Sequence, residues 1–419
     1  MPPTERAGEL REVDHLIIGG GMTAAAAAMA LADADPDARV ALLSAEEHAP
    51  YDRPPLSKDL WHDEAADPSE IQHDRDLFGG AELVLGRRVV RLDAGAHEAV
   101  DDAGTRWRFG RALLATGARP VVPPFAEGIA VARPFRTLSD FTRLRERTRE
   151  RRRITVVGGG FLGSELAAAL VGTGASVTMV FPERDVLARV LPAALAARVS
   201  LRLRRAGVEV RAGTLVDALV PQRPGDPDAP VELRGDDGEA WTADEVVLCV
   251  GVRPNVELAR EAGLTVDDGI VVDDRFRASA PDLYAAGDVA RFPAPALGPM
   301  RVEHEEHAKL SGMHAGRTMA GADEPYDHLP MFYSDVLDLG YEAVGRVDAQ
   351  LDAVVTGPAA DDDASADAPG LVWYRDEDGS PVGALAWNAF GHLEGAREVL
   401  REARPFEVEE LRRRVALDG

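Results

Sequence analysis

The sequence predicts an α/β protein with two Rossmann-like units and a C-terminal α+β domain that contains an antiparallel sheet. The apolar run 15–18 leads into the glycine turn 19–24 and then into a helix-forming stretch, and the run 154–157 leads in the same way into the turn 158–163. A strand, a glycine-rich turn and a helix in this order open a βαβ unit. Beyond Met331 the chain changes to short apolar runs separated by turn residues, which predicts the antiparallel sheet.

Further elements follow the same plan in both units. Each helix leads to a second apolar strand, and a later strand in each unit stops at a glycine. Residues 100–109 resemble a hairpin with its turn at 102–104, residues 376–379 form another hairpin turn, and residues 361–367 read as a solvated loop. The other strands expected are 39–43, 112–115, 176–181, 246–250, 283–288, 340–347, 353–356, 371–374 and 382–387. The helices expected are 164–171, 304–319, 392–402 and 407–415.

Composition excludes several classes of protein. The 419 residues have a formal net charge of −25, which repels nucleic acid and anionic lipid, so a nucleic-acid-binding role is not expected. The longest uncharged stretch, 16–32, is split by glycines and reads as strand, turn and helix, so we expect no membrane span. The acidic stretch 1–12 lacks the apolar core of a secretory signal, which makes a cytoplasmic location the expectation.

The glycine turns have the pattern that binds a dinucleotide. The first glycine allows a sharp bend, the second lets a pyrophosphate approach the backbone, and the third lets helix and strand pack closely. The helix N-terminus then offers free N–H groups to the phosphates. The residues assigned to these positions are Gly19, Gly21 and Ala24 in the first unit, and Gly158, Gly160 and Gly163 in the second.

A carboxylate follows the second strand of each unit. Glu183 lies 20 residues after Gly163, where an acid accepts a hydrogen bond from an adenosine ribose 2′-OH and repels a 2′-phosphate. This favours NADH over NADPH, although the adjacent Arg184 could meet a phosphate. In the first unit the candidates are Glu46 and Glu47, of which Glu46 is preferred over the alternative that both belong to a solvated acidic turn.

The two units are expected to bind different dinucleotides. FAD is long and needs a further contact remote in sequence, which the Gly287–Asp288 pair can supply as a carboxylate for a ribityl hydroxyl. We therefore assign FAD to the first unit and the nicotinamide dinucleotide to the second. Thr116, Gly117 and Gly251 follow the strands that stop beside each nucleotide. The expected division is 12–121 (FAD-binding, first part), 122–252 (NAD-binding), 253–330 (FAD-binding, second part) and 331–419 (C-terminal α+β domain).

Several motifs resemble one family across almost the whole chain, from about residue 14 to residue 415. They are 50–58 (PYDRPPLSK), 158–165 (GGGFLGSE), 181–184 (FPER), 302–304 (VEH), 340–345 (GYEAVG) and 386–390 (AWNAF). The chain resembles the FAD- and NAD(P)-dependent pyridine nucleotide oxidoreductases, in the branch of apoptosis-inducing factor and the oxygenase-coupled ferredoxin reductases. This resemblance implies the glutathione-reductase type of fold, with FAD held tightly and without a covalent bond.

The resemblance also implies roles for individual residues. Arg53 would meet the FAD phosphates, and Lys58 would lie near flavin N5, paired with Glu165. Phe161 would line the nicotinamide channel, and Glu303 and His304 would border flavin and nicotinamide. Lys58, Glu165 and His304 are therefore the catalytic candidates. Tyr333 stands where the family commonly has tryptophan, and cell-death or DNA-related roles are not carried over to this acidic chain.

Two chemical alternatives are disfavoured. His304 and His307 lie three residues apart rather than four, and no third ligand is evident, so we expect no metal. Cys249 is the one cysteine, so the chain has no dithiol relay, and in an apolar strand it reads as a small hydrophobic residue.

The expected activity is transfer of a hydride from NADH to FAD. Electrons then pass directly from the flavin to a ferredoxin-like protein, a quinone or a small oxidant. Ferredoxins are usually acidic, so the charge of −25 counts mildly against that partner unless basic residues cluster locally. The alternative is a slow, NADH-responsive flavoprotein that acts through conformational change and partner binding, as apoptosis-inducing factor does. A homodimer is possible.

Overall fold

The computed structural model describes residues 9–63, 65–148, 152–360 and 368–417. The backbone divides into two units, each assembled from separate stretches of chain. The first unit contains the chain up to Arg53 together with 68–119 and 253–330, and the second contains 54–67, 120–252 and 331–419. The four-segment division expected from the sequence stays a prediction.

The first unit is built on a mainly parallel sheet. Its strand order is β3-β2-β1-β6-β5-β4, and β18 pairs with β6. A second sheet has the order β17-β19-β20. The elements are β1 (Leu10–Ile18), α1 (Met22–Ala34), β2 (Val40–Leu43), β3 (Glu82–Val84), β4 (Val89–Asp93), β5 (Glu98–Asp101), β6 (Arg106–Leu114), α5 (Glu257–Glu261), β17 (Ile270–Val271), β18 (Leu283–Ala285), β19 (Ala290–Ala294), β20 (Gly298–Met300) and α6 (Glu305–Met319), with short 3₁₀ helices η3 (Pro68–Ile71), η4 (Arg75–Phe78) and η6 (Gly287–Val289).

The core of this unit follows from its apolar strands. Ile17 pairs with Leu42 on one side and Leu113 on the other, and all three side chains are fully buried. A parallel strand buried on both faces needs a continuous apolar sequence, which explains the runs without alternation. Each such side chain stabilises the fold by about 1.5–3 kcal/mol.

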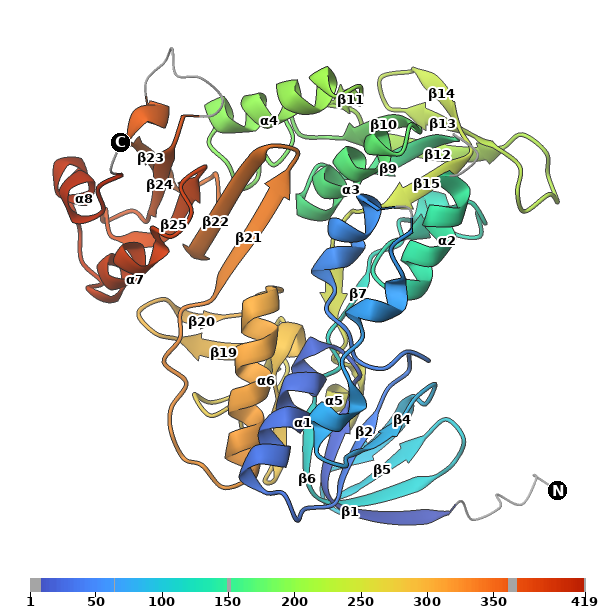
Figure 1. The fold of residues 1–419 in the computed structure, drawn as a ribbon, viewed down its shortest axis with the longest axis vertical. Coiled ribbons are helices and arrows are strands. Elements are labelled where there is room, and N and C mark those ends of the chain that lie inside the picture. Colours follow the sequence, from blue (N-terminus) through green and yellow to red (C-terminus); the bar gives the residue numbers. More distant parts are fainter. Residues whose placement is uncertain (1–8, 64, 149–151, 361–367, 418–419) are drawn as a thin grey trace. The chain divides into compact units, whose positions relative to one another are not determined.

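Helices α1 and α6 pack against each other at very short range (Figure 1). Helix α1 is rich in alanine, and α6 carries Gly312 and Gly316 on the contacting face. A Cβ at position 312 would lie 2.3 Å from the backbone oxygen of Thr23, and one at 316 would lie 2.6 Å from that of Ala27. Small residues on both helices therefore set their separation.

The second unit contains one parallel sheet and two antiparallel sheets. The parallel sheet has the order β11-β10-β9-β15-β8, and β12-β13-β14 form a separate three-stranded sheet. The elements are β8 (Ala132–Pro134), α2 (Leu138–Thr148), β9 (Arg153–Val157), α3 (Phe161–Gly172), β10 (Ser176–Phe181), α4 (Ala193–Arg205), β11 (Glu209–Ala212), β12 (Val216–Pro221), β13 (Val231–Gly235), β14 (Ala240–Ala243) and β15 (Glu245–Leu248), with η1 (Pro54–Leu56), η2 (Asp59–Trp61) and η5 (Pro124–Ala126). The chain passes between the units in β7 (Ala118–Pro120) and β16 (Val252–Pro254).

The C-terminal part of the second unit is an antiparallel sheet with the order β21-β22-β25-β24-β23 (Figure 1). Its elements are β21 (Met331–Val336), β22 (Leu339–Gly345), β23 (Asp352–Thr356), η7 (Pro358–Ala360), β24 (Gly370–Arg375), β25 (Pro381–Trp387), α7 (Leu393–Arg401) and α8 (Val408–Arg414). Tyr341 and Trp387 stack with their ring centroids 6.2 Å apart, and both are fully buried. Aromatic stacking of this kind fixes the register of β22 against β25.

Several expected boundaries differ from the observed ones. The first strand begins at Leu10 rather than at 15, because polar residues at the edge of a sheet can continue a strand without being buried. The expected strand 112–115 continues the second arm of the hairpin as the single strand β6. The expected strand 246–250 ends at Leu248, so Cys249 follows it. The expected loop 361–367 lies outside the described residues.

Among the described residues, no helix is both long and apolar enough to cross a membrane.

Candidate functional site

The first glycine turn connects β1 to α1. Gly19 has φ +135°, and a Cβ there would lie 2.1 Å from the backbone oxygen of Ala115, so only glycine fits. Gly21 caps the helix without any side-chain hydrogen bond, and the nearest atom to a Cβ there is the Arg53 guanidinium at 4.0 Å. The helix N-terminus thus lies open beside a cation. Ala24, the third position, is fully buried in α1.

Glu46 joins two residues of the motif that follows β2. The Tyr51 hydroxyl donates to Glu46 Oε2 at 2.6 Å, and Arg53 donates to Oε1 at 2.8 Å. The backbone N–H of Glu46 also bonds the Ser44 hydroxyl. The structure therefore brings Glu46 and Arg53, predicted separately from the sequence, into one ion pair close to the turn at Gly21.

Lys309 of α6 forms an ion pair with the motif 50–58. Its ammonium donates to Asp52 at 2.9 Å and to Glu305 at 2.7 Å, and His73 lies 3.3 Å from the other Asp52 oxygen. Burial raises the pKa of Asp52, but hydrogen bonds from His73 and Lys309 outweigh this effect and lower it below its ordinary value. Asp52 is thus held as a carboxylate next to Arg53.

The Gly287–Asp288 turn lies at the end of β18, as the sequence predicts. The Gly287 N–H donates to the Ser311 hydroxyl of α6, and a Cβ at 287 would collide with Thr23 of α1. Arg301 donates to the backbone oxygen of Asp288 at 3.1 Å and to the Glu303 carboxylate at 2.6 Å. This turn therefore lies against the N-terminal turn of α1.

His304 precedes α6 as its N-cap residue. Burial lowers its pKa to about 4, although the nearby Asp288 and Glu306 carboxylates oppose this shift. The imidazole is therefore neutral at pH 7. Its neighbour one turn later, His307, is fully buried, stacks on Phe292 with ring centroids 4.4 Å apart, and has a pKa lowered to about 3 by burial.

Asn255 holds the backbone of the predicted pair Thr116 and Gly117. Its side-chain amide donates to the Thr116 backbone oxygen at 2.8 Å, and its N–H donates to the Gly117 backbone oxygen at 2.9 Å. The Thr116 hydroxyl returns a bond to the Asn255 backbone oxygen. The sequence analysis missed Asn255, although it lies one residue after the motif Gly251–Pro254.

The second glycine turn repeats the first. Gly158 has φ +122°, and a Cβ there would lie 2.2 Å from the backbone oxygen of Cys249. A Cβ at Gly163 would lie 2.1 Å from the backbone oxygen of Gly158, whereas Gly160 has nothing within 4 Å. Gly160 caps α3 without a side-chain hydrogen bond, so the N-terminus of this helix is open as well.

Glu183 follows β10 and is paired with an arginine of its own loop. Arg189 Nε lies 2.5 Å from the Glu183 carboxylate, and the Arg184 side chain is 95% exposed. The loop is fixed to the turn by the bond from Leu187 N–H to the Gly159 backbone oxygen. The predicted carboxylate is present, therefore, but Arg189 already pairs with it. Gly251, which follows strand β15, has φ +97°.

Lys58 and Glu165 lie together, as the family resemblance implies. Lys58 Nζ is 3.4 Å from Glu165 Oε1, and both side chains are at most 14% exposed. The hydroxyls of Ser57 and Ser334 each donate to one Glu165 oxygen at 2.6 Å. Two hydroxyl donors thus fix the position of this carboxylate.

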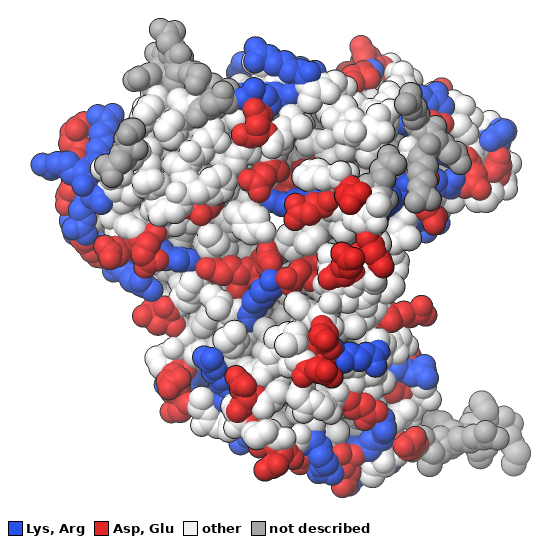
Figure 2. Space-filling view, viewed as in Figure 1, with Lys and Arg blue, Asp and Glu red and all other residues white. Residues whose placement is uncertain are grey.

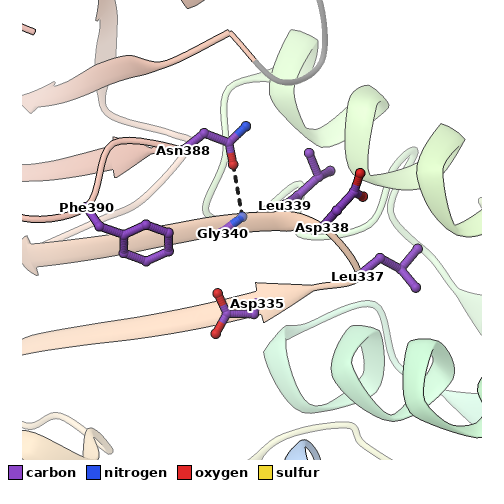
Figure 3. Close-up of a pocket in the computed structure, with 7 residues that line it drawn as sticks. All are labelled: Asp335, Leu337, Asp338, Leu339, Gly340, Asn388 and Phe390. Carbon is purple, nitrogen blue, oxygen red and sulfur yellow. Dashed lines mark hydrogen bonds between the residues drawn. The ribbon is translucent and has the colours of Figure 1, made fainter. Parts of the chain in front are cut away.

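Two residues of β21 complete the surroundings of Lys58. The ammonium lies 4.6 Å from the Tyr333 ring centroid, and it donates a hydrogen bond to Asp335 at 3.3 Å. Asp335 also lines a pocket of about 490 Å³ with Leu337, Asp338, Leu339, Gly340, Asn388 and Phe390 (Figure 3). Phe161 contacts Phe332 of the same strand, with ring centroids 5.0 Å apart.

The single cysteine, Cys249, has an unreactive thiol. Burial, with a smaller contribution from the Glu165 carboxylate, raises the pKa of Cys249 to about 12. The thiolate is the nucleophile in cysteine chemistry, and this thiol stays protonated at neutral pH. Among the described residues, no group of three or more His, Cys, Asp or Glu side chains could hold a metal ion.

Both turns fit the dinucleotides that the sequence predicts. At Gly21 and Gly160 a Cβ would find space rather than atoms, which leaves room for a pyrophosphate against each open helix end. Arg53 supplies a cation in the first unit, and Glu183 supplies an acceptor in the second.

Comparison with protein families agrees with this geometry. Residues 13–312 match the family described as pyridine nucleotide-disulphide oxidoreductase, and residues 315–368 match the domain described as apoptosis-inducing factor, mitochondrion-associated, C-term. The first match spans more than half of the chain. The protein therefore belongs to the pyridine nucleotide-disulphide oxidoreductase family, whose members use flavin and nicotinamide cofactors, and it is an oxidoreductase.

Relatives by sequence include apoptosis-inducing factors and ferredoxin reductases of oxygenase systems. A putative mitochondrial apoptosis-inducing factor 1 of Drosophila melanogaster is 31% identical over 95% of this chain and 64% of its own length, so the chain spans less than two thirds of that relative. The ferredoxin–NAD(+) reductase component of an anthranilate 1,2-dioxygenase system of Burkholderia cepacia is 34% identical, over 92% of this chain and 93% of its own.

Solved structures share the fold. A ferredoxin reductase from Rhodopseudomonas palustris is 30% identical with a TM-score of 0.83, covering 94% of this chain and 96% of its own. The putidaredoxin reductase of a covalent putidaredoxin reductase–putidaredoxin complex is 27% identical with a TM-score of 0.85, covering 95% of each chain. The α/β fold of this protein is thus that of ferredoxin reductases.

Sequence reasoning missed residues that hold the predicted ones in place. Besides Asn255 these are Tyr51, Asp52, Ser57, Lys309, Ser334 and Asp335. Tyr51, Asp52 and Ser57 lie inside the quoted motif 50–58, and that position was the available signal. Lys309 also had a signal, because it is one of only two lysines in the chain.

Proposed function

We propose that the protein is an FAD-dependent NADH oxidoreductase. FAD would bind at the turn that begins at Gly19, and NADH at the turn that begins at Gly158. The chemistry that the flavin would supply when bound is to accept a hydride from the nicotinamide and then to release the electrons. The observation that carries this proposal is the repeated turn, open at Gly21 and at Gly160, with a carboxylate after the next strand of each unit.

We further propose two Rossmann-like domains of the glutathione-reductase type and a C-terminal α+β domain. The strand orders β3-β2-β1-β6 and β11-β10-β9-β15 support this proposal, because each continues outward from the strand that precedes the glycine turn. The five antiparallel strands β21 to β25 support the third domain.

Roles are proposed for the chain's own polar residues. Arg53 would bind the FAD phosphates, and Glu46 would accept from the adenosine ribose. Lys58 would donate a hydrogen bond at flavin N5, where Glu165 orients it. His304 would border the flavin as a neutral imidazole, consistent with its lowered pKa.

The preference for NADH is proposed from Glu183. Its carboxylate would accept from the ribose 2′-OH and repel a 2′-phosphate. Arg189 reduces this discrimination, because its largely exposed guanidinium pairs with the carboxylate. Arg184, the next residue in the chain, adds a second exposed cation. We therefore expect a preference for NADH without strict exclusion of NADPH.

Electrons are proposed to leave directly from the flavin. Cys249 is the only cysteine, and its pKa of about 12 keeps it protonated, so a dithiol relay does not operate. The acceptor proposed is a ferredoxin-like protein, with a quinone or small oxidant as alternatives. The names of the Burkholderia cepacia relative and of the putidaredoxin complex support a ferredoxin. On the face drawn in Figure 2, basic residues lie in small groups beside acidic ones.

Anaerobic titration of the purified yellow protein with NADH tests this function. The expected result is stoichiometric bleaching of the flavin absorbance, followed by reoxidation on addition of a ferredoxin or quinone. Replacement Lys58→Met is expected to slow reduction by NADH at least tenfold without loss of bound flavin. A colourless protein after reconstitution with FAD would contradict the assignment of the two turns. Bleaching by NADPH as efficient as by NADH would contradict the role proposed for Glu183.

A second candidate function is supported by the match of residues 315–368 to the C-terminal domain of apoptosis-inducing factor. In this alternative the protein turns over slowly, stays reduced after NADH binding, and acts through a binding partner. Turnover separates the two functions. An oxidoreductase reoxidises within seconds when a suitable acceptor is present, whereas the alternative predicts a reduced protein that persists with every acceptor tested.

A further inference from the structure

Lys58 has two carboxylate partners in the second unit, and only one was expected. The family resemblance implies a pair with Glu165, whose Oε1 lies 3.4 Å from Lys58 Nζ. Asp335 Oδ2 lies at 3.3 Å and accepts a hydrogen bond from the same ammonium. The ammonium therefore has a second anionic partner of equal proximity.

The two carboxylates differ in their surroundings. Glu165 is 10% exposed and already accepts from the hydroxyls of Ser57 and Ser334. Asp335 is 47% exposed and lines the pocket at the turn between β21 and β22 (Figure 3). Glu165 is thus fixed by its own donors, whereas Asp335 is accessible to solvent and uses a hydrogen bond to Lys58.

The Tyr333 ring lies on the same face of β21 as Asp335, because side chains two residues apart share a face of a strand. Lys58 Nζ lies 4.6 Å from the ring centroid, within the distance at which an aromatic face attracts a cation. Residues 333 and 335 therefore hold the ammonium from one strand, and Glu165 holds it from α3.

We propose that Asp335 is a positioning residue for Lys58 and, with Glu165, sets the electrostatic field of this ammonium group. Lys58, Glu165 and Asp335 together carry a net charge of −1, whereas a simple lysine–glutamate pair would be neutral. This proposal rests on the proposed function, in which Lys58 acts at flavin N5. An extra negative charge there opposes the addition of electrons, so Asp335 makes the bound flavin a stronger reductant.

The chain offers a direct way to observe Lys58. Lys58 and Lys309 are its only lysines, so labelling with ¹⁵Nζ-lysine gives two side-chain ammonium signals. Lys309 serves as an internal reference, because its partners are Asp52 and Glu305 of the first unit. The signals are measured for the wild-type holoenzyme, Asp335→Asn, Asp335→Glu and the control Asp338→Asn.

Asp338 is the matched control for Asp335. It lies three residues further on at the β21–β22 turn, lines the same pocket and pairs with Arg202 at 3.1 Å. The proposal predicts that Asp335→Asn shifts the Lys58 signal or broadens it through faster exchange with water. Asp335→Glu restores the signal at least in part, and Asp338→Asn leaves it unchanged. An unchanged Lys58 signal in Asp335→Asn, or an equal change in Asp338→Asn, overturns the proposal.

The midpoint potential of the bound flavin gives the second measurement. Asp335→Asn is expected to shift it to a more positive value, and the shift should shrink at high salt because a half-exposed charge is screened. Asp338→Asn is expected to shift it less. A potential in Asp335→Asn equal to that of the wild type overturns the electrostatic part of the proposal.

Failure of the proposed function gives a different result from failure of this inference. If the wild-type protein binds no flavin, or its flavin is not reduced by NADH, the proposed function fails while the ammonium signals still decide whether Asp335 holds Lys58. If the wild type is reduced normally and Asp335→Asn changes neither the Lys58 signal nor the potential, only the role of Asp335 is overturned.

Discussion

The two glycine turns have almost the same backbone but are packed differently. In both, the first glycine has a positive φ and faces a backbone oxygen of the strand next to it, Ala115 in one unit and Cys249 in the other. They differ at the third position, which is Ala24 in α1 and Gly163 in α3. A Cβ at 163 would collide with the Gly158 backbone oxygen, whereas the Cβ of Ala24 is accommodated.

This difference indicates which two elements of each unit pack most closely against each other. In the second unit the helix approaches its own turn, so Gly163 is required. In the first unit the close approach has moved to the contact between α1 and α6, where Gly312 and Gly316 face the backbone of α1. The same motif can therefore place its smallest residue on a different pair of elements.

The largest expected effect comes from filling the first position of either turn. Gly19→Val forces a β-branched residue into a positive φ and against a backbone oxygen, which costs several kcal/mol. We expect a colourless protein without FAD. Gly158→Val is expected to remain yellow but to lose reduction by NADH. Flavin absorbance and NADH titration distinguish the two.

Matched controls separate local strain from site loss. Gly104 and Gly238 have φ +86° and +82°, and a Cβ at either would meet nothing within 4 Å. Gly104→Ala in the first unit and Gly238→Ala in the second should keep both FAD binding and NADH reduction. If Gly104→Ala also abolished the colour, the loss in Gly19→Val would reflect backbone strain rather than the nucleotide site.

Acid should destabilise the first unit, which contains four histidines whose pKa is lowered by burial: His15, His304, His307 and His314. A group with a lower pKa in the folded state takes up its proton more readily when unfolded, so stability is full above the ordinary value of 6.5 and falls as the pH decreases. Over 1.5 pH units, His304 and His307 each account for about 2 kcal/mol.

The measurement is hydrogen exchange between pH 7 and pH 5, followed separately in β6 of the first unit and β24 of the second. Protection in β6 should decrease over this range, which lies above the ordinary pKa values of carboxyl groups. His307→Gln removes one titrating group and should flatten the pH dependence of β6. An equal pH dependence in His307→Gln and the wild type would contradict this explanation.

Exchanging the third-position residues tests the packing difference directly. Gly163→Ala pushes α3 from its turn and is expected to weaken NADH binding about tenfold. Ala24→Gly loses about 1 kcal/mol of stability, because glycine is unfavourable inside a helix, and leaves FAD binding intact. Thermal denaturation and NADH titration give both values. Equal loss of nucleotide affinity in both variants would show that the two positions are equivalent.

The smallest expected effect concerns the carboxylates that follow each turn. Arg189→Ala frees Glu183 and removes a cation, so the preference for NADH over NADPH in kcat/KM should rise a few-fold. Glu183→Gln should lower it. The pair is exposed, which keeps the effect small. A preference that falls in Arg189→Ala would mean that the arginine, rather than Glu183, contacts the NADH ribose.

The sequence predicted those parts of the fold that depend on local pattern. Strand 176–181 was predicted with its observed bounds, and the helix expected at 304–319 begins one residue later as α6. Strand β21 was not predicted, because its buried positions are Ser334 and Val336, and a serine at one of them interrupts the apolar alternation that indicates a strand. The three-stranded sheet β12-β13-β14 was also missed.

The candidate site shows the same division. Residues defined by a motif can be found from the sequence: Gly158 from the spacing of the glycine turn, and Lys58 from the resemblance of residues 50–58 to a known family. Asn255, Ser334 and Asp335 act through contacts with residues more than 100 positions away, and a single sequence carries no signal for pairs at that separation. Their roles follow from the fold.

The contact of α1 with α6 also has a consequence for how the first unit responds to pressure. Gly312 and Gly316 bring two helix backbones together with no side chain between them. Pressure acts on proteins chiefly by eliminating internal voids, and two backbones this close leave little space for a void between them. Residues 23–27 of α1 and 312–316 of α6 should therefore keep their mutual distance under compression that deforms looser parts of the same unit.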